Sequence, residues 1–138
     1  MHHILFVYGT LKQGHPRDSA LSGQKYLGVA RTVDSFAMFD LGGYPGLVYA
    51  TPDLAAGVKI WGEIYEVSEE CLLKLDKIEG VEIELYGRKE IELDHVNLCH
   101  LPLYNNTFHN LHRKVVYTYV YLNDVSDKKN CGVYWFLR

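Results

Sequence analysis

The sequence predicts an α+β fold in which a twisted, barrel-like mixed β-sheet packs against one or two α-helices. Most of the regular segments are short, and they are either continuously apolar or alternate apolar and polar residues, a pattern typical of strands. Between residues 68 and 80 the chain instead has the cap and the apolar spacing of a helix. Sheet therefore dominates the predicted fold, and the order of its strands is left open.

The chain has 138 residues, and because domains commonly have about 100–150, residues 1–138 are expected to form one domain. Apolar residues make up 48% of it and charged residues 22%, the balance of a protein that folds in water. It has no signal-peptide pattern and no apolar segment near the ~20 residues of a membrane helix. We expect a cytoplasmic protein without a membrane partner, and a monomer is favoured over an oligomer.

Charges and metal-binding side chains exclude several classes of partner. The net charge is −3, and residues 63–94 hold 11 of the 17 acidic but only 4 of the 14 basic residues. Because such a segment repels polyanions, no nucleic-acid partner is expected. The three cysteines include no C-x-x-C pair and are expected to be reduced thiols. The histidine pairs near residues 95–100 and 109–112 lack a third ligand at a familiar spacing, so no metal site is expected.

The N-terminal half is expected to contain two strands. Residues 4–8 are an unbroken apolar run that ends at Gly9, which favours a strand buried on both faces and followed by a loop. Residues 58–67 alternate apolar and polar side chains, which predicts a long strand with a bulge or a close contact at Gly62. Residues 15–24 are expected to form one or two helical turns.

A helix of about three turns is predicted after the second strand. Ser68 is a suitable N-cap, and Glu69 and Glu70 complement the helix dipole in the first turn. Gly80 is a natural C-terminal end. The helix is therefore expected to end close to Glu79.

The rest of the chain is expected to return to sheet. Residues 90–94 alternate acidic and apolar side chains, and residues 115–122 form a second alternating segment with three tyrosines on one side. Residues 101–112 are expected to be irregular and residues 124–130 to form a polar turn.

The loop after the first strand is the first candidate for a binding site. Gly9 allows a ligand to approach the backbone closely, and consecutive N–H groups bind the oxygen of a carboxylate or a carbonyl. Thr10 adds a hydroxyl group. The loop lacks the glycine patterns of nucleotide-binding sites. A plain turn without a ligand is the alternative interpretation.

Glu79 is the second candidate. It lies at the end of the predicted helix beside Ile78, where partial shielding from water would raise its pKa toward neutrality, as a general acid or base requires. The alternative is an ordinary solvated glutamate at a helix end. Asp76 is expected to be only a surface neighbour of Glu79.

The order of these segments resembles the γ-glutamylcyclotransferase-like family, also called AIG2-like, and in particular its γ-glutamylamine cyclotransferase branch. The similar segments are FVYGTLK at residues 6–12, YPG at 44–46, WGEIY at 61–65, LDKIE at 75–79, then Tyr86, Arg88 and the tyrosine-rich residues 116–121. Each is short, but their order and spacing fill nearly the whole chain. The resemblance implies the γ-glutamylcyclotransferase-like fold.

The resemblance also implies a reaction and a site without a cofactor. Glu79 would take a proton from the α-amino group of a γ-glutamyl compound, whose nitrogen attacks the γ-carbonyl to form 5-oxoproline. Glu79 would then return the proton to the amine or amino acid that leaves. The residues expected to bind this small-molecule substrate are Tyr8, Gly9, Thr10, Leu11 and Tyr86, with Tyr44 and Tyr121 at the rim.

Two segments depart from the family pattern. Glu82 and Glu84 add acidic groups near the expected site, so the identity of the leaving amine is open. Residues 101–112 have no counterpart in the pattern. The alternative function is a non-catalytic module that binds a small ligand or a protein on the same fold.

Overall fold

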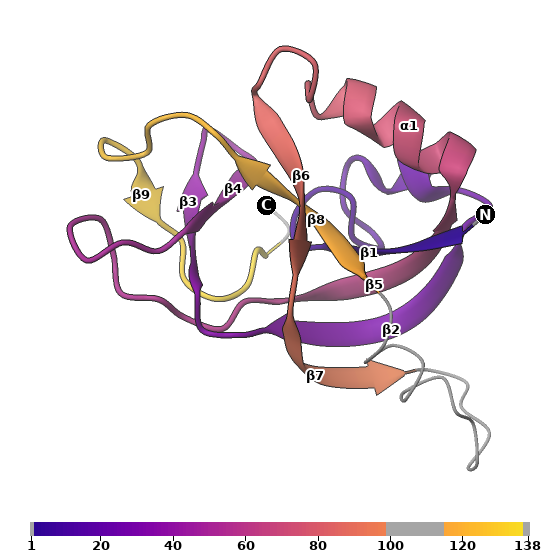
Figure 1. Cartoon of the computed structure of the whole chain (residues 1–138), viewed down its shortest axis with the longest axis horizontal. Coiled ribbons are helices and arrows are strands. Elements are labelled where there is room, and N and C mark those ends of the chain that lie inside the picture. Colours follow the sequence, from indigo (N-terminus) through magenta and orange to yellow (C-terminus); the bar gives the residue numbers. More distant parts are fainter. Residues whose placement is uncertain (1, 99–114, 137–138) are drawn as a thin grey trace.

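The computed structural model describes residues 2–98 and 115–136 (Figure 1). Their elements are β1 (His2–Val7), the 3-10 helix η1 (Asp18–Leu21), β2 (Lys25–Thr32), β3 (Phe36–Asp40), β4 (Pro45–Tyr49), β5 (Trp61–Ser68), α1 (Glu69–Ile78), β6 (Tyr86–Ile91), β7 (Leu93–Leu98), β8 (Val116–Tyr121) and β9 (Lys129–Asn130). The predicted irregular segment at 101–112 lies outside the described residues. Within them, no helix is long and apolar enough to cross a membrane.

The strands form one mixed sheet that curls upon itself. Its order is β7-β2-β5-β1-β8-β4-β3-β9, and β6 pairs with β8 from outside this path. Only Glu92 separates β6 from β7, yet β6 pairs with β8 while β7 pairs with β2. This bent pair therefore carries the chain from one side of the central strands to the other (Figure 1). The predicted α+β fold with a barrel-like mixed sheet is confirmed, with α1 as the α-helix of the described part.

Side-chain alternation along β1 separates two clusters of the core. Ile4 and Phe6 belong to the cluster enclosed by the curled sheet. Leu5 and Val7 point to the opposite face and pack with Leu72 and its neighbours on α1. Both faces of β1 are thus buried, as its unbroken apolar sequence predicts. The end of β1 consequently lies between the sheet and the helix.

Helix α1 begins and ends at the predicted signals. The Ser68 hydroxyl accepts a hydrogen bond from the backbone N–H of Cys71 at 3.1 Å, which caps the first turn. Glu79 is the C-cap residue. Gly80 follows with a φ of 68°, in the left-handed region that favours glycine. The helix therefore holds Glu79 at its C-terminal end.

Two of the predicted strands have different bounds in the structure. The predicted strand at 90–94 is wrong, because the chain bends at Glu92 and its two halves pair with different neighbours. The strand predicted at 58–67 begins only at Trp61. At Gly62 an added Cβ would lie 2.4 Å from the carbonyl oxygen of Val7, so this glycine permits a close contact.

The C-terminal strand has its predicted form. Tyr117, Tyr119 and Tyr121 on β8 all pack in the cluster that contains α1. The predicted polar turn at 124–130 contains a hydrogen bond of 2.9 Å from the backbone N–H of Ser126 to the Asp124 carboxylate, and it ends in β9. The sequence therefore predicts the turn, whereas the two-residue strand β9 at its end was not predicted.

Candidate active site

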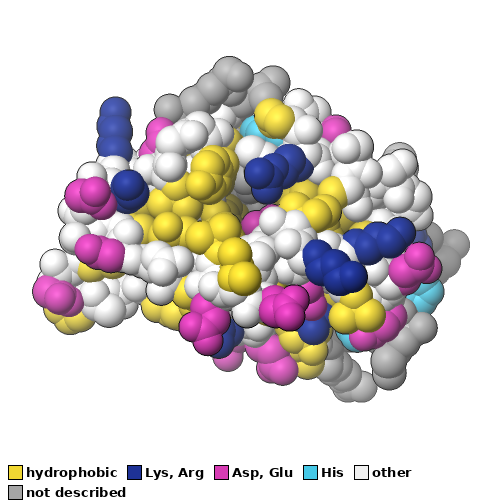
Figure 2. All heavy atoms as spheres, turned by 90° about the horizontal axis from the view of Figure 1, so that it is seen from above, with side chains coloured by type: hydrophobic (Ala, Val, Ile, Leu, Met, Phe, Trp, Pro, Cys, Tyr) yellow, Lys and Arg dark blue, Asp and Glu magenta, His cyan; other side chains and the backbone are white. Residues whose placement is uncertain are grey.

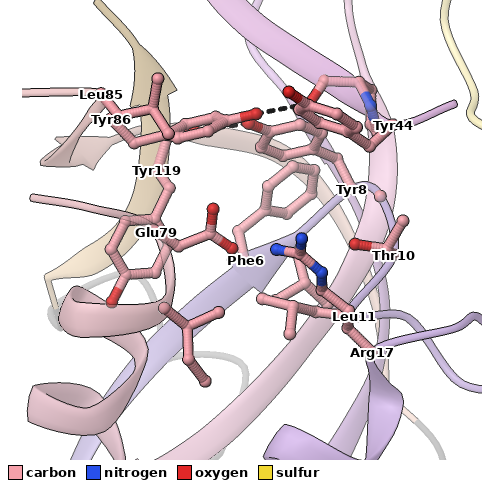
Figure 3. Close-up of a pocket in the computed structure, with 14 residues that line it drawn as sticks. Phe6, Tyr8, Thr10, Leu11, Arg17, Tyr44, Glu79, Leu85, Tyr86 and Tyr119 are labelled. Carbon is pink, nitrogen blue, oxygen red and sulfur yellow. Dashed lines mark hydrogen bonds between the residues drawn. The ribbon is translucent and has the colours of Figure 1, made fainter. Parts of the chain in front are cut away.

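A cavity of about 110 Å³ opens where the end of β1 meets the end of α1 and the first residues of β4 and β6 (Figure 3). Its lining residues are Phe6, Val7, Tyr8, Gly9, Thr10, Leu11, Arg17, Tyr44, Pro45, Ile78, Glu79, Leu85, Tyr86 and Tyr119. The structure thus brings together Glu79 and most of the residues expected to bind substrate.

The outer edge of the cavity is partly apolar. Tyr44 is 38% exposed and Ile78 is 47% exposed, whereas Phe6 and Tyr86 are buried. On the side of the molecule that carries α1, apolar side chains gather in a patch with acidic and basic side chains around it (Figure 2). A ligand that enters the cavity would therefore pass a rim of apolar and charged side chains and reach an interior lined by aromatic rings.

The loop after β1 is fixed by its own backbone. The N–H of Lys12 donates to the carbonyl of Gly9 at 3.1 Å, and the N–H of Arg17 donates to the carbonyl of Thr10 at 2.7 Å. The N–H groups of Gly9, Thr10 and Leu11, by contrast, donate no hydrogen bond to any other described residue. These three residues line the cavity. They can supply donors to a ligand oxygen.

Gly9 is required by a close contact within the protein. A Cβ at this position would lie 2.5 Å from Cγ of Pro45, the first residue of β4. The carbonyl of Pro45 accepts a hydrogen bond from the Tyr86 hydroxyl at 3.0 Å. Gly9 therefore lets the loop approach β4 and β6 closely, and this contact closes one side of the cavity.

Glu79 extends from the helix end into the cavity. In Figure 3 its carboxylate and the Arg17 guanidinium point toward one another. Burial raises the pKa of Glu79, and the positive charge of Arg17 opposes that rise. Among the described residues, no protein group donates a hydrogen bond to this carboxylate. A carboxyl group with a raised pKa and no fixed partner is suited to proton transfer.

The hydroxyl groups of Tyr8 and Tyr86 are already used within the protein. Tyr8 donates to the carbonyl of Tyr119 at 2.6 Å and accepts from the N–H of Leu47 at 3.2 Å. Tyr86 donates to Pro45. Burial raises the pKa of both tyrosines well above the ordinary value, so both stay neutral. These two residues therefore form rigid, neutral walls of the cavity.

A polar network holds the end of α1 to the sheet. The Tyr119 hydroxyl donates to the Asp76 carboxylate at 2.7 Å, and Arg88 Nε lies 3.5 Å from the same oxygen. The interpretation of Asp76 as only a surface neighbour is wrong, because its side chain is only 18% exposed and contacts two strands. Asp76 thereby positions the last helical turn, three residues before Glu79.

Two site residues differ in position from the sequence analysis. Tyr121, expected at the rim, packs edge-on against Tyr86 with ring centroids 5.2 Å apart and is not among the residues that line the cavity. Arg17 lines the cavity but was not identified from the sequence. The sequence signal for this residue was a basic side chain a few positions after Gly9. The hydrogen bond from the Arg17 N–H to the carbonyl of Thr10 holds Arg17 beside the loop.

The sequence of the chain is similar to those of known proteins. The sequence profile of the family described as gamma-glutamyl cyclotransferase, AIG2-like, matches residues 5–135. A putative gamma-glutamylcyclotransferase of Vibrio cholerae is 40% identical over 92 residues, which are 67% of this chain and 74% of that protein. The gamma-glutamylaminecyclotransferase of Rattus norvegicus is 36% identical over 100 residues, 67% of this chain and 64% of the relative.

The fold is also similar to that of a solved structure from this family. The crystal structure of an AIG2-like protein from Mus musculus superposes with a TM-score of 0.65 and 27% identity, over 88% of this chain and 77% of that one. The family profile covers almost all of the chain, from within β1 to beyond β9. This chain belongs to the AIG2-like gamma-glutamyl cyclotransferase family.

Proposed function

We propose that the protein is an enzyme that converts a γ-glutamyl amine or γ-glutamyl amino acid to 5-oxoproline and the free amine. One observation carries this proposal: the Glu79 carboxyl, with its raised pKa, shares a cavity with the backbone N–H groups of Gly9, Thr10 and Leu11, which have no partner among the described residues. Family membership and the name of the rat relative support it.

The reaction needs one proton carrier because nucleophile and electrophile belong to one molecule. Glu79 accepts a proton from the substrate α-amino group while the α-nitrogen forms a bond to the γ-carbonyl carbon. The tetrahedral intermediate then collapses, the bond to the leaving nitrogen breaks, and Glu79 returns the proton to that nitrogen. Holding the tethered groups in a reactive shape supplies much of the rate acceleration.

The loop after β1 and the tyrosine walls of the cavity have different roles in this mechanism. The N–H groups of Gly9, Thr10 and Leu11 donate to the carbonyl oxygen as negative charge develops on it. The rings of Tyr8 and Tyr86, whose hydroxyl groups bind protein carbonyls, provide rigid apolar surface around the glutamyl chain. Their exclusion of water favours ring closure over hydrolysis.

The Glu79→Gln variant tests the proposal. It keeps the size of the side chain but cannot carry a proton, so 5-oxoproline formation, measured by mass spectrometry, should fall by about 10²- to 10⁴-fold. Glu82→Gln is the matched control, because Glu82 is exposed and outside the cavity. A fully active Glu79→Gln protein would disprove this mechanism. Binding of 5-oxoproline without turnover by the wild type would favour the non-catalytic module.

A further inference from the structure

Among the described residues that line the cavity, Arg17 is the one with a basic side chain. It lies one residue before η1 and is held there by the hydrogen bond from its N–H to the carbonyl of Thr10. The loop that supplies the free N–H groups therefore also supplies the cation. In Figure 3 the guanidinium group lies between Glu79 and Thr10, directed into the cavity.

The Arg17 guanidinium has no anionic partner within the described part of the chain. No ion pair or side-chain hydrogen bond joins it to another described residue, although its charge acts on Glu79. The other two arginines of the described residues have such partners: Arg31 pairs with Asp94 at 2.8 Å, and Arg88 lies 3.5 Å from Asp76. A guanidinium fork has the geometry to bind a carboxylate through two parallel hydrogen bonds. Arg17 is thus available for a carboxylate of the ligand.

The covalent structure of a γ-glutamyl substrate identifies the carboxylate that Arg17 can reach. In a γ-glutamyl compound the α-nitrogen and the carbon of the α-carboxylate are bonded to the same carbon, so they lie about 2.5 Å apart. Glu79 must contact the α-nitrogen to remove its proton. The α-carboxylate then lies beside Glu79 as well, where a neighbouring cation offsets the repulsion between the two anions.

We propose that Arg17 binds the α-carboxylate of the γ-glutamyl group, so that the N–H groups of Gly9, Thr10 and Leu11 serve the γ-carbonyl oxygen. This inference rests on the proposed function. It assigns the Arg17 guanidinium to the α-carboxylate end of the glutamyl chain and the loop N–H groups to the γ-carbonyl end. Arg17 is then a specificity-determining residue that selects a free α-carboxylate over an α-amide.

A pair of substrates tests this assignment. One is a γ-glutamyl anilide with a free α-carboxylate, and the other is the same anilide with an α-carboxamide. The wild type should prefer the acid in kcat/KM. Arg17→Gln should lower kcat/KM for the acid by about 10- to 100-fold, the effect of one charge-assisted contact, with little effect on the amide. Arg17→Lys should retain part of the preference, because it keeps the charge without the fork.

Lys77→Gln is the matched control, because it removes an exposed positive charge on the last turn of α1 outside the cavity. It should keep the preference for the acid. Equal loss on both substrates in Arg17→Gln, or no preference in the wild type, would overturn the assignment. So would a loss in Arg17→Gln that depends only on whether the leaving amine carries a carboxylate, as glycine does and methylamine does not.

A binding measurement separates this inference from the proposed reaction. Calorimetry should show that the wild type binds 5-oxoproline more tightly than 5-oxoprolinamide and that Arg17→Gln loses this difference. If this result is obtained while no γ-glutamyl compound is turned over, the assignment of Arg17 stands and the proposed function fails. If turnover is normal but neither binding nor kcat/KM depends on the α-group, the assignment fails alone.

Discussion

Lys12 and Glu79 are two ionisable side chains beside the same loop, and the protein surrounds them differently. Lys12 is completely buried, and its Nζ donates to the carbonyl of Trp135 at 2.6 Å and lies 3.5 Å from the centroid of the Tyr134 ring. Glu79 faces a cavity and accepts no hydrogen bond from the described residues. Lys12 thus ties the loop to the C-terminal segment, whereas Glu79 is free to meet a ligand.

The pKa shifts of the two groups do not reveal this difference. Burial lowers the pKa of Lys12 to about 8, and burial raises the pKa of Glu79. In both cases the charged form is disfavoured for the same reason, loss of hydration. The partners of each group therefore indicate its role better than the direction of its pKa shift. Four predictions test this distinction.

The largest expected effect is on the pH dependence of stability at Lys12. Its folded pKa of about 8 lies below the ordinary 10.5, so between these values the unfolded chain binds more protons and wild-type stability rises with pH. The rise should reach about 3 kcal/mol. Lys12→Met lacks the titrating group and should not show it. Urea unfolding of both proteins at pH 7.5 and 10.5 measures the difference, and parallel pH curves would contradict it.

The next largest effect concerns the wall between the loop and β4. Gly9→Ala places a Cβ 2.5 Å from Pro45, and the resulting overpacking should cost about 2 kcal/mol of unfolding free energy. It should also lower kcat/KM, because the loop N–H groups shift away from the cavity. Gly23→Ala is a control with open space around the new Cβ but a φ of 82°, and it should lose stability without losing activity. Unchanged stability in Gly9→Ala would contradict this, because it would show that the loop can shift to accommodate the added Cβ.

Local sequence signals were enough to predict α1, the loop after β1 and the position of Glu79 at the end of the helix. A cap at Ser68, a glycine at residue 80 and an apolar run that ends at Gly9 each act over a few residues. Their structural consequences appear at those residues. The tyrosines on β8 were predicted to share a face, because alternation along a strand is also local.

Long-range pairing explains what the sequence did not reveal. The hydrogen bond between Tyr119 and Asp76 joins residues 43 positions apart, and only the register of β8 decides that Tyr119 reaches the cavity while Tyr121 packs behind Tyr86. Strand β2 was not predicted, because a register shift between Tyr26 and Gly28 interrupts its pattern. Bending at residue 92 is likewise set by two different partner strands.

A smaller effect is expected in the network that positions the helix end. Tyr119→Phe removes the hydroxyl that donates to Asp76 at 2.7 Å, while Arg88 still contacts that carboxylate. The unfolding free energy should fall by about 1 kcal/mol. Because Glu79 follows this turn, kcat should fall several-fold with little change in KM. Thermal unfolding and steady-state kinetics measure both, and full activity with lowered stability would show that Glu79 does not depend on this network.

The smallest expected effect is the stability of Glu79→Gln, and its sign is opposite to that at Lys12. A carboxyl group with a raised folded pKa favours folding while protonated, and that contribution is lost as pH rises from its ordinary pKa through the raised value. Glu79→Gln should therefore have a Tm closer to the wild type at pH 4 and a higher Tm than the wild type at pH 7. Glu82→Gln, at an exposed position, should show no such change between the two pH values. If Glu79→Gln instead loses stability at pH 7, the ionised carboxylate has stabilising partners within the fold, and Glu79 is a structural group like Lys12.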